Sequence, residues 1–200
     1  EPVKLVREPY GPDLLLQVDA NTAYTRDDFD LLKRLDEFNL LLIEQPIYEE
    51  DLLGHAKLAD YIETPVCLDE TIISADIARD AIELGAAEII NIKPSRVGGY
   101  IESVKIHDIS VANNIPVWCG GMLETGIGRA ANLALAAMPG FTLPGDTSAS
   151  SRYFETDLTE PFVLVDGHIS VPTGPGIGVD PIPEIIERFA VSREWIKRPN

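Results

Sequence analysis

The sequence predicts an α/β protein in which buried parallel strands alternate with helices. Short apolar runs recur at near-even spacing up to residue 145, and the segments between them carry helical patterning. Most of these runs have apolar residues at consecutive positions, which is typical of strands buried on both faces of a parallel sheet. The six predicted strands are Leu14–Val18, Leu40–Ile43, Val66–Leu68, Ile89–Ile92, Pro116–Cys119 and Phe141–Leu143.

Capping residues indicate where the intervening helices begin and end. Thr25, followed three residues later by Asp28, resembles a capping box that opens a helix with apolar residues up to Phe38. Ser74 fits the N-cap of a second helix, which ends near Gly85. Further helices are expected near 50–61, 100–113 and 127–138.

The pattern changes after residue 145. The dipeptide Asp166-Gly167 lies between two apolar runs and predicts a β-hairpin with a two-residue turn. A stretch rich in Gly and Pro follows at 172–178, and a short helix is expected near 183–189.

Composition restricts the classes to which the protein can belong. The chain has 16 Lys and Arg against 33 Asp and Glu, a net charge of −17, so it is a poor partner for nucleic acids or anionic membrane surfaces. No apolar run reaches the roughly 18 residues of a membrane span. Cys67 and Cys119 lie in apolar runs without metal-binding spacing. We expect buried reduced thiols, which suit a cytoplasmic protein.

Charged residues stand at the ends of four successive predicted strands. Asp19, Glu44, Asp69 and Lys93 follow one another at separations of 25, 25 and 24 residues. Right-handed crossovers place successive strands about 4.8 Å apart with their carboxyl ends at one edge, so the three acids should converge in register. Clustered carboxylates repel unless a cation neutralises them, and oxygen ligands favour Mg²⁺ or Mn²⁺. The alternative is that each acid is an ordinary helix cap or loop residue.

Lys93 stands where it could act on a substrate beside such a cation. Partial desolvation near a metal should lower the pKa of a lysine, which suits a general base. The alternative is a lysine that only pairs with one of the carboxylates. A cation and a basic lysine together favour abstraction of a proton next to a carboxylate.

Five ordered motifs carry a family resemblance. They are Gln17–Asn21, Ile43–Pro46, Leu68–Glu70, Asn91–Pro94 and Gly121–Thr125. Together they closely resemble the muconate-lactonising subgroup of the enolase superfamily, and within it most the o-succinylbenzoate synthases and N-acylamino acid racemases. The resemblance implies the C-terminal part of a modified (β/α)7β barrel, similar to a TIM barrel, in a protein that also has a capping domain. It implies a partial barrel over 1–160, followed over 161–200 by the hairpin and short helix packed with the barrel or capping domain.

The resemblance also implies roles for the site residues. Asp19, Glu44 and Asp69 would bind Mg²⁺, with Mn²⁺ or Co²⁺ as substitutes, and Lys93 would be an acid/base catalyst. The implied reaction removes the proton α to the carboxylate of a small-molecule substrate through an enediolate. It would be either the dehydration to o-succinylbenzoate in menaquinone biosynthesis, catalysed by a lyase, or racemisation of an N-acylamino acid, catalysed by an isomerase, or both. A homo-oligomer is expected from the resemblance alone.

Other functions stay open. They are a dipeptide epimerase, a muconate cycloisomerase and a non-catalytic metal-binding fragment. Family members carry an earlier Lys-x-Lys motif with a second catalytic lysine, and Lys4 lies in a predicted helix rather than at a strand end. We therefore expect the chain to belong to a longer polypeptide and to be inactive alone.

Weaker site candidates lie in loops. The resemblance makes the loop with Gly121, Met122 and Glu124 face the substrate, although a tight turn with Met122 in the core is an alternative. Asp146 and Ser148 are further pocket candidates. Asn21 could orient Asp19 as a metal ligand without binding the metal itself, or it could belong to a turn that starts a helix. The three histidines, His55, His107 and His168, are expected at the surface.

Overall fold

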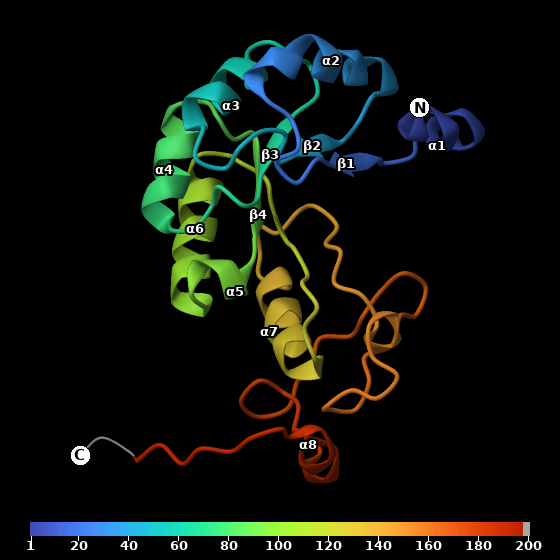
Figure 1. The fold of residues 1–200 in the computed structure, drawn as a ribbon, viewed down its shortest axis with the longest axis vertical. Helices are drawn as coiled ribbons and strands as arrows, with labels where there is room; N and C mark the ends of the chain where they lie inside the picture. The colour runs from blue at the N-terminus through green and yellow to red at the C-terminus, as the bar shows by residue number, and fades with distance from the viewer. Residues whose placement is uncertain (198–200) are drawn as a thin grey trace. The chain divides into compact units, whose positions relative to one another are not determined.

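The computed structural model describes residues 1–197, and their contacts divide them into two compact units, each described by itself. The first unit comprises Glu1–Gly120 and Met138–Gly145, and the second comprises Gly121–Ala137 with the residues from Asp146 onward. The first unit is built on a curled parallel sheet, half of a TIM-type barrel, with strand order β1-β2-β3-β4-β5 (Figure 1). The strands are β1 (Gln17–Asp19), β2 (Leu42–Glu44), β3 (Val66–Leu68), β4 (Ile89–Ile92) and β5 (Val117–Cys119).

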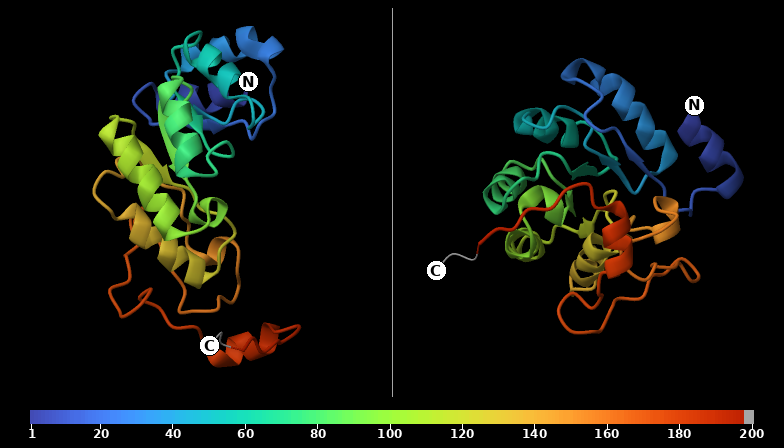
Figure 2. Two further views of the ribbon diagram at one scale, coloured as in Figure 1. Left: turned by 90° about the vertical axis from the view of Figure 1, so that its left-hand side faces the viewer. Right: turned by 60° about the horizontal axis from the view of Figure 1, so that its bottom comes forward.

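Helices follow the strands as the alternating pattern predicts (Figures 1 and 2). The first unit has α1 (Pro2–Tyr10), the 3-10 helices η1 (Arg26–Asp28) and η2 (Arg34–Phe38) on either side of α2 (Phe29–Lys33), then α3 (Leu52–Ala59), α4 (Ala75–Glu83), α5 (Pro94–Val97) and α6 (Tyr100–Ala112). The second unit has α7 (Gly126–Ala136), the 3-10 helix η3 (Ser150–Arg152) and α8 (Pro183–Phe189).

On one face of the sheet, an apolar layer of side chains is followed by polar side chains at the carboxyl ends of the strands. Leu42, Cys67, Ile89 and Trp118 pack together in the core, and the Trp118 indole N–H donates to Cys67 Sγ at 3.4 Å. Since side chains two positions apart share a face, the residues that follow this layer on the same face are polar or small. They are Glu44, Asp69, Asn91 and Gly120. Cys67 and Cys119 are both buried, as expected.

The strand register differs from the expectation that the three acids stand level. Asp19 pairs directly with Glu44, but Glu44 pairs with Cys67, so Asp69 lies two residues further along its strand. Inclined rows of this kind follow from the tilt of strands in a barrel. The acids thus share one edge of the sheet, but only the first two are in register.

Two predicted β elements are shorter in the structure. The run at Phe141 forms a single parallel bridge with Val117, because the flanking Pro139 and Pro144 have no N–H for a ladder. The predicted hairpin is one bridge between Val165 and His168. Its Asp-Gly turn is confirmed, with φ values of 49° and 77°, as such turns require.

The helix predicted from the capping box is divided. Thr25 and Asp28 do form the box, yet the segment continues as η1, α2 and η2, because its two ends tighten into 3-10 turns. The prediction of surface histidines was wrong for two residues. His55 and His107 are buried. Both have hydrogen-bond partners inside the protein, which are Asp108 and the carbonyl of Pro139 for His107, and Gln45 and the carbonyl of Asp51 for His55.

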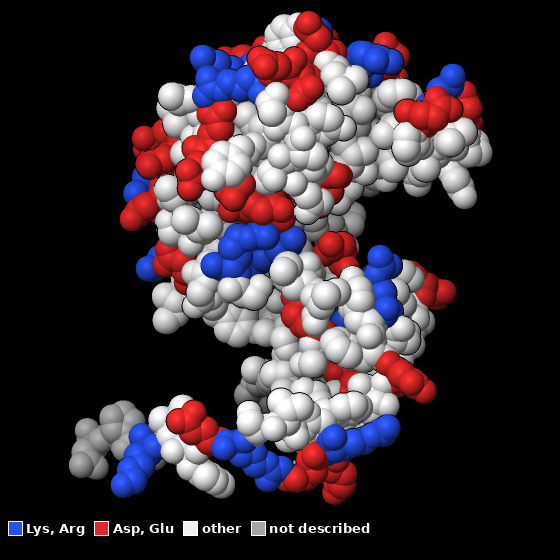
Figure 3. Space-filling model, in the orientation of Figure 1, with Lys and Arg blue, Asp and Glu red and all other residues white. Residues whose placement is uncertain are grey.

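Surface charge agrees with the acidic composition. Figure 3 shows acidic side chains spread over the visible face of each unit, with basic side chains among them. Among residues 1–197, none of the helices has the length and apolar character needed to cross a membrane.

Loss of the Ser74 cap should destabilise the fold moderately. The Ser74 side chain accepts a hydrogen bond from the Ile77 N–H at the start of α4. Ser74→Ala should lower the free energy of unfolding by about 1 kcal/mol, measured by urea denaturation. Ser74→Asp keeps a capping oxygen and should retain most of the stability. Equal losses in the two variants would contradict this role.

Candidate active site

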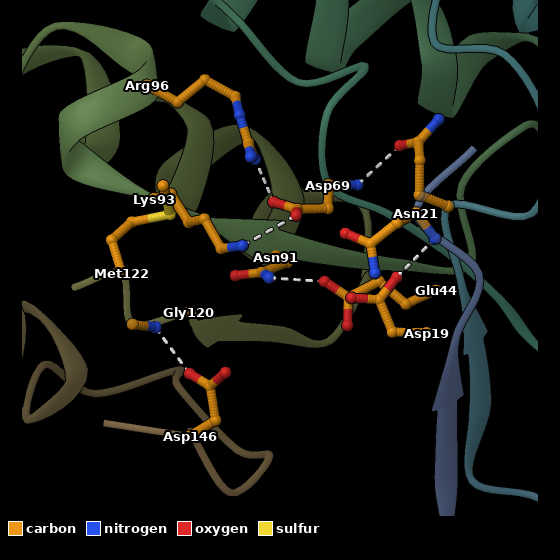
Figure 4. A network of polar contacts seen from close by, with 12 residues as sticks. Asp19, Asn21, Glu44, Asp69, Asn91, Lys93, Arg96, Gly120, Met122 and Asp146 are labelled. Carbon is orange, nitrogen blue, oxygen red and sulfur yellow. Dashed lines mark hydrogen bonds and ion pairs between the residues drawn. The ribbon is translucent and has the colours of Figure 1, made fainter. Parts of the chain in front are cut away.

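The site lies at the carboxyl ends of strands β1 to β4 (Figure 4). Asp19 ends β1 and Glu44 ends β2, while Asp69 and Lys93 follow the last residues of β3 and β4. Asp19 is exposed, whereas Glu44 and Asp69 are only 2% and 1% exposed. The structure therefore brings the four strongest candidates from the sequence to one edge of the sheet.

Two basic side chains hold Asp69. The Lys93 ammonium lies 2.8 Å from Oδ2, and the Arg96 guanidinium donates to Oδ1. Sequence reasoning missed Arg96, although its position one turn after Lys93 at the start of α5 could have indicated that both reach the same partner. The buried Asp69 carboxylate is thus compensated by two cations.

The Asp69 carboxylate affects the protonation of Lys93. Burial alone would lower the pKa of Lys93, but its hydrogen bond to Asp69 and the attraction of that carboxylate raise the pKa above the usual value for lysine. The lowered pKa was predicted for a lysine beside a bound cation and stays a prediction for that state. In this structure Lys93 pairs with the Asp69 carboxylate, which is the alternative that the sequence left open. Lys93 is therefore held as an ammonium.

Glu44 is held differently, since no cationic side chain among residues 1–197 forms an ion pair with it. Its Oε1 accepts a hydrogen bond of 2.7 Å from the Asn91 side-chain N–H. The pKa of Glu44 is raised to about 8, mainly by burial and further by the charges of Asp69 and Asp19, while the Asn91 hydrogen bond and the Lys93 charge oppose the rise. The other polar atom of this pair, Asn91 Oδ1, is buried without a hydrogen-bond partner in the described structure.

These features test whether a cation fits. The donors are carboxylate oxygens, which suit a hard divalent ion, and a nearby cation would oppose the rise that burial causes in the pKa of Glu44. Within residues 1–197, however, no three acidic, His or Cys side chains stand close enough to hold one ion, since Asp69 faces Lys93 and Arg96. The chemistry of the donors fits, and Asp69 would have to turn from its basic partners.

Gly120 leaves space for the polar side chains beside it. A Cβ at this position would lie 2.6 Å from Lys93 Cε and would overlap the Asn91 side-chain amide. The sequence singled out Gly121, whose Cβ would have no neighbour closer than 3.3 Å. Gly120 is therefore the glycine on which the packing of Lys93 and Asn91 depends.

Asn21 is exposed and contacts Asp19 through its backbone. Its N–H donates to Asp19 Oδ1 at 2.8 Å, and its φ is 44°, as in the tight turns that Asn tolerates. This favours the alternative of a turn over a side-chain role at the metal.

The loop candidates lie in the second unit. The Gly121 N–H donates to Asp146 Oδ1 at 2.5 Å, and Glu124 Oε1 accepts from the Met122 N–H and the Asn132 side chain, each at 2.7 Å. Met122 is 46% exposed, so it does not fill the core. The Ser148 carbonyl accepts from the buried Arg129. Arg129 and Asn132, which sequence reasoning missed, thus hold this segment together.

The fold and this strand-end site define a class of protein. The chain belongs to the enolase C-terminal domain-like family, whose profile matches residues 1–185. The resemblance inferred from the five motifs is confirmed.

Particular relatives carry narrower names. The chain is 65% identical over 196 residues to an N-succinylamino acid racemase of Amycolatopsis sp, covering 98% of this chain and 53% of the relative. It is 48% identical over 195 residues to the o-succinylbenzoate synthase of Bacillus subtilis (strain 168), covering 97% and 52%. An enolase-superfamily structure from Enterococcus faecalis V583 matches with a TM-score of 0.89 and 46% identity, covering 94% and 51%. The chain spans about half the length of the curated relatives it matches.

The two adjacent glycines should respond differently to a methyl group. Gly120→Ala should lower the free energy of unfolding by about 1 to 3 kcal/mol, because the added Cβ overpacks Asn91 and Lys93. Gly121→Ala would place its Cβ 3.3 Å from Asp146 Oδ1, a tight contact that a small side-chain shift relieves, and should cost less. Urea denaturation of both variants measures the difference, and equal costs would refute the assignment of Gly120 as the crowded position.

His55 should make stability depend on pH. Burial, the largest cause, lowers the pKa of His55 below its usual 6.5 despite the contact with Asp51. The unfolded chain then binds more protons than the folded one below about pH 6.5, so the free energy of unfolding falls as pH falls through that range. His55→Gln should lose less stability than the wild type between pH 7.5 and 5. His168→Gln, at an exposed histidine, is the control and should follow the wild-type curve.

Proposed function

We propose that this chain supplies the cation-binding acids and one acid/base lysine of an enzyme that removes the proton α to a substrate carboxylate. The observation that carries the proposal is the gathering of Asp19, Glu44, Asp69 and Lys93 at one sheet edge. The names of the relatives support o-succinylbenzoate synthase, N-succinylamino acid racemase, or both as the activity. Mg²⁺ is the proposed cofactor, with Mn²⁺ or Co²⁺ as substitutes.

The residues of this chain would divide the work as follows. Asp19, Glu44 and Asp69 would hold the cation, which when bound stabilises the negative charge that develops on the substrate carboxylate. In racemisation, Lys93 as a free amine would take the α proton, the C–H electron pair would pass into the enediolate, and a second group would return a proton to the opposite face. In dehydration, a second group would take the α proton and Lys93 as an ammonium would stabilise the enediolate charge. The enediolate electron pair would then form the C=C bond as hydroxide leaves the β carbon, and the proton taken up by the second group would convert the hydroxide to water.

The structure favours these activities over a dipeptide epimerase. Such an enzyme would be expected to bind the substrate amino group with two acids near the last barrel strand. The segment Asp146-Thr147-Ser148 has one acid, Asp146. The Oδ1 atom of Asp146 already accepts a hydrogen bond from the Gly121 N–H. The cytoplasmic location and a homo-oligomer stay predictions.

Removal of the Lys93 amine should abolish proton exchange at the substrate. Lys93→Ala in the intact protein should slow exchange of the α proton of an N-succinylamino acid with deuterated solvent by about 100- to 10,000-fold. Lys105→Ala, at an exposed lysine paired with Glu102 on α6, is the matched control. NMR of the substrate measures the exchange, and an unchanged rate in Lys93→Ala would exclude Lys93 as an acid/base.

A further inference from the structure

Gln45 follows Glu44 directly and lies at the centre of a buried hydrogen-bond network. It is fully buried, with a φ of 37°, a left-handed conformation that costs about 1 to 2 kcal/mol for an L-residue. Its backbone N–H donates to the Cys67 carbonyl, and its own carbonyl accepts from the Thr22 N–H, both at 2.9 Å. The Gln45 backbone thus joins the loops that follow β1 and β2 to strand β3.

The side chain of Gln45 holds the backbone on either side of Glu70. Its Oε1 accepts from the Asp69 N–H at 2.9 Å and from the Thr71 N–H at 3.1 Å. Its Nε2 donates to Thr71 Oγ1 at 2.8 Å and to the Ile47 carbonyl at 3.2 Å. Because the N–H groups of Asp69 and Thr71 both bind this one buried oxygen, the backbone of Asp69 is held in place and only its side chain is free to rotate.

His55 adds to the contacts that set which end of the Gln45 amide faces Asp69. His55 Nδ1 lies 2.9 Å from the Asp51 carbonyl, which can only accept, so Nδ1 carries the proton. Its Nε2 is then an acceptor, 3.3 Å from Gln45 Nε2. If the Gln45 amide were flipped, its Oε1 would face the lone pair of His55 Nε2, and its NH₂ group would face the N–H donors of Asp69 and Thr71. The His55 tautomer therefore favours the same orientation as the two N–H donors and the Ile47 carbonyl, with Oε1 on Asp69 and Thr71.

We propose that Gln45 is a positioning residue that sets Asp69 for cation binding, and that His55 orients Gln45. The inference rests on the proposed function, because it takes Asp69 as a cation ligand. Since Lys93 and Arg96 already compete for the Asp69 carboxylate, a displaced backbone would leave that side chain with its basic partners. The network acts through main-chain position, so its loss should weaken cation affinity without removing a ligand.

Direct titration of Mn²⁺ into the intact protein by calorimetry tests the inference without any substrate. Gln45→Met keeps the side-chain length and removes every amide hydrogen bond. It should raise the Kd for Mn²⁺ by about 10- to 100-fold with an unchanged circular dichroism spectrum. His107→Gln alters a buried histidine within α6, held by Asp108 and Pro139, and should leave the Kd within about twofold of the wild type.

Asp69→Asn separates the two ideas. A strong loss of Mn²⁺ affinity in Asp69→Asn together with a wild-type Kd in Gln45→Met would overturn the positioning role and leave the proposed function intact. A wild-type Kd in Asp69→Asn would remove the assigned ligand, and the positioning role would fall with it.

A pair of His55 variants carries the test if Gln45→Met does not fold. His55→Gln can still accept from Gln45 Nε2, and its Kd should stay within about twofold of the wild type. His55→Asn keeps the contact with the Asp51 carbonyl but is too short to reach Gln45, and should raise the Kd by about tenfold. Equal Kd values in the two variants would overturn the role of His55.

Discussion

Negative charge gathered at one edge of a parallel sheet is the constraint on which the rest of this structure depends. Strand units of nearly equal length carry Asp19, Glu44 and Asp69 to that edge, and two of the three are buried there. A buried charge is costly unless it is compensated. Lys93 and Arg96 compensate Asp69, whereas Glu44 has a raised pKa instead. Asp69 and Glu44 therefore respond differently to burial: Asp69 is paired with cations, whereas the pKa of Glu44 is raised.

The sheet supplies the geometry that this charge requires. Because side chains alternate along each strand, one face carries an apolar layer below and the polar residues above it. Leu42 and Cys67 lie in the core layer, two positions before Glu44 and Asp69. The tilt of the strands then staggers the acids, so the site is inclined rather than level. Gln45 joins the staggered loops through its hydrogen bonds, and its left-handed backbone conformation is part of this arrangement.

The sequence allowed prediction of the features that depend on local pattern. The apolar runs located four strands of the sheet, and the first only in part, because β1 begins at Gln17 and Leu14 and Leu15 are exposed. The nearly equal spacing of Asp19, Glu44, Asp69 and Lys93 located the site edge. The stagger could not be predicted, because it comes from the closure of the sheet. Gln45 and His55 were missed for another reason. Their partners lie in other loops, and neither residue type nor spacing shows a buried hydrogen bond to a distant backbone N–H.

The energetically unfavourable features at this edge support the proposed function. An unpartnered buried oxygen such as Asn91 Oδ1 costs about 1 to 3 kcal/mol, and the left-handed Gln45 adds about 1 to 2 kcal/mol. Together they are a sizeable part of the roughly 5 to 15 kcal/mol that holds a domain folded. A sheet edge with a purely structural role would be more stable with an apolar residue in place of Glu44. Costs of this kind concentrate where a protein binds or reacts, which weighs against a non-catalytic role.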